Sequence, residues 1–92
     1  MANVVVTLKI MPGSPEEDLN KIEADAKKKI IDFAGEGEVK SEKVPVAFGL
    51  KSLKIIFVMP EDKGSTEPIE DAVGDIKGVQ SVEVSDVRRA VG

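Results

Sequence analysis

The chain has 92 residues, 41% of them hydrophobic and 33% charged, which suffices for one hydrophobic core and leaves no room for a second domain. It contains no cysteine and no histidine, so disulfides, zinc sites and catalytic triads of the serine or cysteine type are excluded. The net charge of -4 argues against a protein that binds nucleic acid mainly through its phosphates.

The N-terminal residues lack the basic start and long apolar segment of a signal peptide, and the chain has no apolar run long enough to cross a membrane. We therefore expect a cytoplasmic protein that makes no contact with a membrane.

Residues 4–10 alternate between apolar and other side chains and are rich in valine, which predicts a strand with one buried face. A helix is expected next. Its predicted start has Ser14 as N-cap, Pro15 at the first helical position and Glu17 closing a capping box. Gly35 ends it, and its predicted apolar stripe consists of Leu19, Ile22, Ala26, Ile30 and Phe33.

Residues 38–47 are predicted to form an edge strand, because Pro45 has no N–H to donate to a neighbouring strand. Residues 53–59 read as a central strand that begins soon after Gly49, and the loop 60–64 ends it.

A second helix is predicted to begin at Ser65 or Thr66 and to end at Gly78. Its buried side chains are expected to be Ile69, Val73 and Ile76. A last strand follows at residues 79–87, and residues 88–92 are expected to form a tail.

The order strand, helix, strand, strand, helix, strand is typical of the ferredoxin-like α+β sandwich, β-α-β-β-α-β. In that fold, two helices cover one face of a four-stranded antiparallel sheet and leave the other face open.

Phe48 stands between two small residues, Ala47 and Gly49, in a chain with only three Phe and no Trp or Tyr. An aromatic at such a strand boundary is either a core residue or a contact for a partner. The sequence leaves these two interpretations equally open.

Arg88 and Arg89 place two guanidinium groups near the C-terminus, where they can reach a carboxylate or phosphate of another molecule. The carboxylates, by contrast, show no pair spaced as an acid/base couple. The sequence therefore favours a binding module, and an enzyme that uses lysine or carboxylates would need a pocket that the sequence does not indicate.

Several segments together resemble the family of translation elongation factor 1-beta in its short archaeal form. They are VAFGLKSL at 46–53, EDKGS at 61–65 and VQSVEV at 79–84, with MP at 11–12 and DVRR at 86–89. The resemblance spans essentially the whole chain. It implies one guanine nucleotide exchange domain over residues 1–92 that promotes GDP release and GTP loading on elongation factor 1-alpha.

The resemblance also implies a site. Phe48 and Gly49 correspond to the Phe-Gly turn that packs against the GTPase in this family, and Lys51 is the basic residue that follows. A basic residue at the C-terminus reaches toward the magnesium and phosphate region, and by position it is Arg89, with Arg88 beside it. The eukaryotic relatives have a lysine there followed by a single residue, whereas this chain continues with Ala90, Val91 and Gly92.

The implied partner is therefore elongation factor 1-alpha in its GDP-bound and nucleotide-free forms. The factor is expected to be a monomer when free, with no cofactor, no direct contact with nucleic acid and no bond chemistry of its own. The alternative is a small-molecule-sensing regulatory domain of the same fold, with residues 11–14 as its ligand loop.

Overall fold

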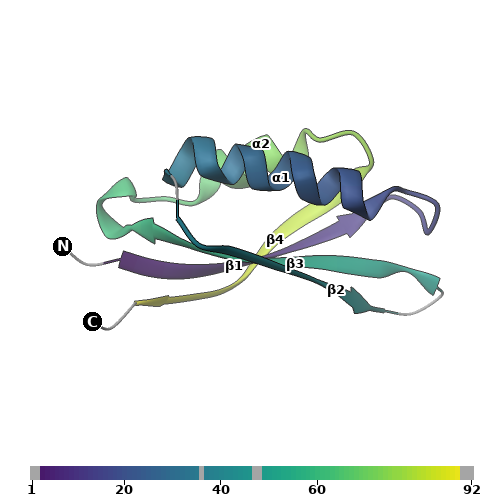
Figure 1. The fold of residues 1–92 in the computed structure, drawn as a ribbon, viewed down its shortest axis with the longest axis horizontal. Helices are drawn as coiled ribbons and strands as arrows, with labels where there is room; N and C mark the ends of the chain where they lie inside the picture. Colours follow the sequence, from purple (N-terminus) through teal and green to yellow (C-terminus); the bar gives the residue numbers. More distant parts are fainter. Residues whose placement is uncertain (1–2, 36, 47–48, 90–92) are drawn as a thin grey trace.

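The computed structural model describes residues 3–35, 37–46 and 49–89. The strands form one antiparallel sheet in the order β2-β3-β1-β4, and both helices cover the same face of it (Figure 1). This architecture confirms the predicted ferredoxin-like α+β sandwich. In chain order the elements are β1 (Asn3–Pro12), α1 (Leu19–Ala34), β2 (Val39–Pro45), β3 (Lys51–Pro60), the 3-10 helix η2 (Glu61–Lys63), α2 (Glu67–Gly74) and β4 (Val79–Arg89).

The core lies between the helices and the two central strands, β1 and β3. Alternate side chains of each strand face the helices, as a period of two requires. The buried residues are Val6, Leu8 and Ile10 of β1, Leu53, Ile55, Phe57 and Met59 of β3, and Ile22, Ala26, Ile30, Ile69, Val73 and Ile76 on the helical side. The apolar stripes predicted for both helices are therefore confirmed, with Leu19 and Phe33 packing at the edge of the core.

β2 is an edge strand, as the proline at its end predicts, although it spans Val39–Pro45 and is shorter than expected. Neither helix in the described part of the chain is long and apolar enough to cross a membrane.

The predicted start of α1 is wrong. The helix begins at Leu19, and Asp18 caps it, because its side chain accepts hydrogen bonds from the N–H groups of Asn20 at 3.0 Å and Lys21 at 3.3 Å. Ser14 instead caps a turn, in which its hydroxyl accepts from the N–H of Glu16. Asp18 stands directly before the apolar stripe and accepts hydrogen bonds from two N–H groups that have no partner within the helix. Ser14, four residues earlier, accepts from none of the N–H groups of α1, so Asp18 is the better N-cap.

α2 also ends earlier than predicted, at Gly74 rather than at Gly78. Gly74 and Asp75 are weak helix formers. The chain then turns through hydrogen bonds from Ile76 to the carbonyl of Val73 and from Val79 to the carbonyl of Ile76, each 3.1 Å. This turn keeps Ile76 in the core and leads the chain into β4.

β4 extends further than predicted, because Arg88 and Arg89 belong to the strand and not to a tail. They pair with Val5 and Val4 of β1. The register shifts between Thr7, which lies opposite Asp86, and Leu8, which lies opposite Val84. Ser85 is therefore the extra residue of a β-bulge, and its hydroxyl donates to the carbonyl of Thr7 at 3.4 Å.

Gly78 joins the turn before β4 to the loop after β1. Its φ is +95°, its carbonyl accepts from the N–H of Gly13 at 2.9 Å, and a Cβ built on it would lie 3.2 Å from the carboxylate of Glu17. Only a glycine meets both conditions without strain.

We expect Asp18→Ala to lower the free energy of unfolding by about 1 kcal/mol, because two amides at the start of α1 lose their acceptor. Ser14→Ala is the matched control and is expected to cost less than about half as much. Urea denaturation of the two variants measures both values. A larger loss of stability for Ser14→Ala than for Asp18→Ala would contradict this assignment and favour Ser14 as the N-cap of the helix.

Gly78→Ala is expected to lower the free energy of unfolding by roughly 1–3 kcal/mol, because it combines an unfavourable φ with a close contact to Glu17. Gly35 also has a positive φ, +87°, but a Cβ built on it has no described atom within 4 Å. Gly35→Ala therefore measures the cost of the backbone conformation without a steric contact. Gly37→Ala lacks both penalties and serves as the neutral control. Thermal unfolding of the three variants should rank them in this order, and equal effects of Gly78→Ala and Gly35→Ala would show that the contact with Glu17 is unimportant.

Candidate functional site

The structure places the predicted site residues in two groups at opposite ends of the sheet. Gly49 and Lys51 lie at the β2–β3 turn, whereas Arg88 and Arg89 end β4 (Figure 1). Phe48, the predicted aromatic contact, lies outside the described residues. Because Arg89 pairs with Val4 and Val4 pairs with Met59, the register fixes the separation of the two groups.

Lys51 and Met59 are eight residues apart on β3. At about 3.4 Å per residue, the two ends of the sheet are separated by roughly 27 Å. A single small ligand is too short to touch both groups, whereas the contact surface of a macromolecular partner is long enough to span them.

At the first end, the turn is closed by a hydrogen bond from the N–H of Val46 to the carbonyl of Leu50 at 2.9 Å. Gly49 has φ +76°, a conformation that favours glycine, and is exposed, as is Lys51 at the first position of β3. The turn therefore presents backbone and a cation to solvent side by side.

The loop after β1 lies beside this turn. Together they enclose a hollow of about 290 Å³, lined by Pro12, Ser14, Pro15, Glu17, Leu19, Gly49 and Lys51. The antiparallel pairing of β1 with β3 brings the end of β1 next to the start of β3. The predicted order of the strands could therefore have indicated that this loop adjoins the predicted site. Part of the loop proposed for the alternative regulatory function, Pro12 and Ser14, thus adjoins the predicted partner contacts.

At the second end, both arginines are paired with carboxylates. The Arg88 Nε lies 2.8 Å from Asp86 Oδ2, and the Arg89 Nη2 lies 2.5 Å from Glu61 Oε1. Arg88 and Arg89 are 78% and 70% exposed, so each pair contributes at most about 1 kcal/mol to stability. The two carboxylates were absent from the prediction, since neither is marked by its local sequence pattern.

The two arginines point to different faces of the sheet. Val6 is buried under the helices and lies opposite Val87, so Val4 and its partner Arg89 belong to the helix side. Arg88, opposite Val5, belongs to the open side. Arg89 is therefore the arginine whose side chain extends toward η2, the turn that follows β3.

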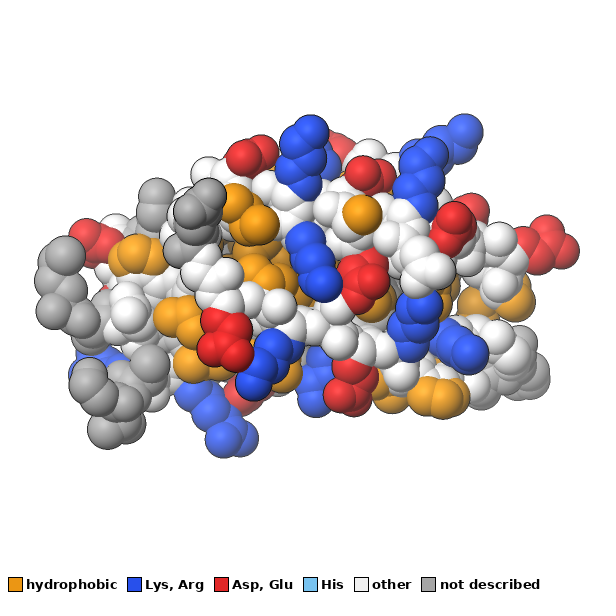
Figure 2. All heavy atoms as spheres, viewed as in Figure 1, with side chains coloured by type: hydrophobic (Ala, Val, Ile, Leu, Met, Phe, Trp, Pro, Cys, Tyr) orange, Lys and Arg blue, Asp and Glu red, His pale blue; other side chains and the backbone are white. Residues whose placement is uncertain are grey.

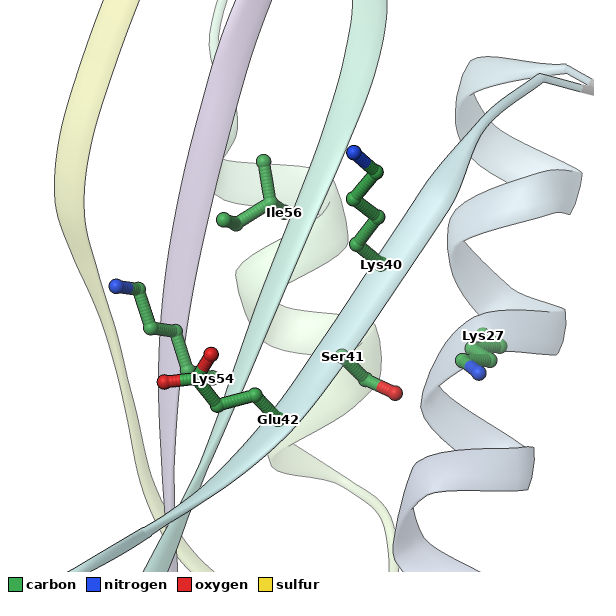
Figure 3. A pocket seen from close by; sticks show the side chains of 6 residues that line it. All are labelled: Lys27, Lys40, Ser41, Glu42, Lys54 and Ile56. Atoms are coloured by element: carbon green, nitrogen blue, oxygen red, sulfur yellow. The ribbon is translucent and has the colours of Figure 1, made fainter.

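A hollow of about 410 Å³ lies beside β2 (Figure 3) and is lined by Lys27, Lys40, Ser41, Glu42, Lys54 and Ile56. Figure 3 shows that the amino groups of the three lysines spread apart instead of converging. Lys27 is paired with Glu23 at 3.7 Å and Lys40 with Glu38 at 3.3 Å. The arrangement does not resemble the convergent polar groups of a small-molecule site.

Charged side chains of both signs are interspersed over the face seen in Figure 2, with no large patch of one sign. Among residues 3–35, 37–46 and 49–89, no group of three acidic side chains that could hold a metal ion is found.

Comparison with known proteins gives matches along nearly the whole chain. The sequence profile described as EF-1 guanine nucleotide exchange domain matches residues 5–90. A Halobacterium salinarum protein named Elongation factor 1-beta is 42% identical over 89 residues, which cover 97% of this chain and 99% of that protein.

Two further proteins with the same name agree. The protein of Methanothermobacter thermautotrophicus is 38% identical over 89 residues, and the protein of Staphylothermus marinus is 44% identical over 92 residues. Each alignment covers 97% of this chain and 98% of the relative.

Proposed function

Because the chain belongs to the EF-1 guanine nucleotide exchange domain family and is a nucleotide exchange factor of translation elongation, we propose that it acts on elongation factor 1-alpha. In this proposal the whole chain is one exchange domain, a monomer when free, which binds the GTPase in its GDP-bound and nucleotide-free forms. It works in the cytoplasm, where translation takes place. The match of an exchange-domain profile to residues 5–90 is the observation that carries the proposal.

The mechanism requires binding and no bond chemistry, so the factor is not an enzyme in the chemical sense and needs no cofactor. It binds the nucleotide-free GTPase more tightly than the GDP-bound form, and by thermodynamic reciprocity the affinity for GDP falls in the complex. A ~1000-fold faster release needs only about 4 kcal/mol of differential binding. A surface of ~800 Å² per partner can supply this amount.

The two ends of the sheet have different roles in this proposal. At the first end, Phe48 acts as a wedge, with Gly49 and Lys51 as neighbouring contacts on the GTPase. At the second end, Arg89 reaches toward the magnesium and phosphate region, and Arg88 contacts the partner beside it. The exposure of Gly49, Lys51 and both arginines and the rigid spacing between the ends support this division.

Release of fluorescent GDP from elongation factor 1-alpha, with and without catalytic amounts of the factor, tests the function. We expect faster release, and we expect Phe48→Ala to abolish most of the acceleration. Acceleration that survives Phe48→Ala would keep the function and remove the wedge. A wild-type factor that leaves the release rate unchanged would refute the exchange function with this GTPase.

The two ends are far enough apart to act independently, so their substitutions should combine in a predictable way. We expect Lys51→Ala and Arg89→Ala each to slow factor-stimulated GDP release by roughly tenfold, as truncation of a contact residue commonly does. The double variant should then lose about the product of the two factors. Lys28→Ala, an exposed cation on α1, is the control and should be without effect. A double variant no slower than either single variant would place both residues in one step and contradict separate contacts.

A further inference from the structure

Arg89 has a fixed partner on a different element. Its Nη2 lies 2.5 Å from the Oε1 of Glu61, a residue 28 positions earlier in the chain. Glu61 is the first residue of η2, directly after β3 ends at Pro60. The ion pair therefore links the end of the edge strand β4 to the turn beyond the central strand β3, and β1 runs between them.

The turn that carries Glu61 is held by the backbone. The N–H of Gly64 donates to the carbonyl of Glu61 at 3.2 Å, and Gly64 itself has φ +78°. Pro60 enters the turn with φ -62° and pairs with Asn3 of β1. The carboxylate thus belongs to a short turn whose backbone is anchored to the sheet. It is a positioned hydrogen-bond acceptor for the long side chain of Arg89.

The β-bulge decides which arginine meets this carboxylate. Ser85 is the extra residue, and beyond it Arg89 stands opposite Val4. Without the extra residue in the pairing, Arg88 would stand opposite Val4 and would take the position on the helix side. The bulge therefore places Arg89, and not Arg88, on the helix side of the sheet, where its side chain reaches the carboxylate of Glu61.

We infer that Glu61 is a positioning residue for nucleotide exchange, which holds the Arg89 guanidinium at the second end of the sheet before the GTPase binds. This inference rests on the proposed exchange function and deepens it. An arginine has many rotamers, and an ion pair that restricts them lowers the entropy lost when the same group binds a partner. Glu61 accepts from Nη2 alone and Arg89 is 70% exposed, so the other N–H groups of the guanidinium can bind an anionic group of the GTPase while the ion pair persists.

The test is a double-mutant cycle between Glu61→Gln and Arg89→Ala in the GDP-release assay with elongation factor 1-alpha. Glu61→Gln keeps the size of the side chain and removes its charge. We expect it to slow factor-stimulated release about two- to fivefold, the range that an exposed ion pair supplies. In the Arg89→Ala background, the same substitution should have no further effect. Asp62→Asn, in the same turn, is the matched control and should release GDP at the wild-type rate.

A second measurement does not depend on the GTPase. The ¹⁵N relaxation of the Arg89 side-chain Nε should show greater motional freedom in Glu61→Gln than in the wild-type factor, with a melting temperature lowered by at most a few degrees. Unchanged relaxation would mean that the pair does not hold Arg89 and would overturn the inference.

The outcomes of the cycle are distinct. A Glu61→Gln factor as fast as wild type, or faster, would overturn the positioning role, and the second of these results would identify the pair as an inhibitory contact. An effect that persists in the Arg89→Ala background would show that Glu61 acts on its own and would also overturn it. A wild-type factor without exchange activity would refute the proposed function itself, together with the inference.

Discussion

The pairing of β1 with β3 on one side and with β4 on the other sets the register of the sheet, and through it the core and both ends of the sheet. Residues 3–10 of β1 lie opposite residues 53–60 of β3, and β4 follows β1 over nearly all of its length. In this register, the apolar side chains of both central strands point to the same face of the sheet, where the helices cover them. These buried side chains of β1 and β3 form the sheet side of the core. A slip by one residue would turn those side chains to solvent, so the register and the core depend on each other.

The same pairing explains why the proposed site has two parts. The turn that carries Gly49 and the strand end that carries Arg89 are joined by the central strands, whose hydrogen-bonded register fixes the distance between them. In the proposed function, the sheet therefore acts as a spacer of fixed length with a contact group at each end. For an exchange factor this is a useful property, since a rigid partner spends less of its binding free energy on ordering itself and more on distorting the bound state of the GTPase.

Much of the fold was predictable from the sequence, because the apolar alternation of β1 and β3 and the stripes of both helices directly record which side chains are buried. The errors lie where one local signal competes with another. Asp18 competes with Ser14 for the helix start, and the chain turns at Gly74 although the apolar spacing continues to Ile76. The bulge at Ser85 has no sequence mark at all, since it depends on pairing with Thr7 across the sheet. The ion pair of Glu61 with Arg89 was likewise beyond sequence reasoning, because it joins residues that only the register brings together. Phe48, Arg88 and Arg89 were singled out from the sequence itself, the family resemblance added Gly49 and Lys51 as contacts, and all five remain predictions.

Amide cross-saturation shows whether both ends of the sheet contact the GTPase in the same complex, as we propose. The perdeuterated, ¹⁵N-labelled factor is bound to protonated, nucleotide-free elongation factor 1-alpha, whose protons are then saturated. A contact at both ends predicts signal loss at residues 49–51 and at residues 86–89 in one experiment, with the exposed residues Ala24, Lys28 and Ile31 of α1 unaffected. Signal loss confined to one end of the sheet, or centred on α1, would contradict it.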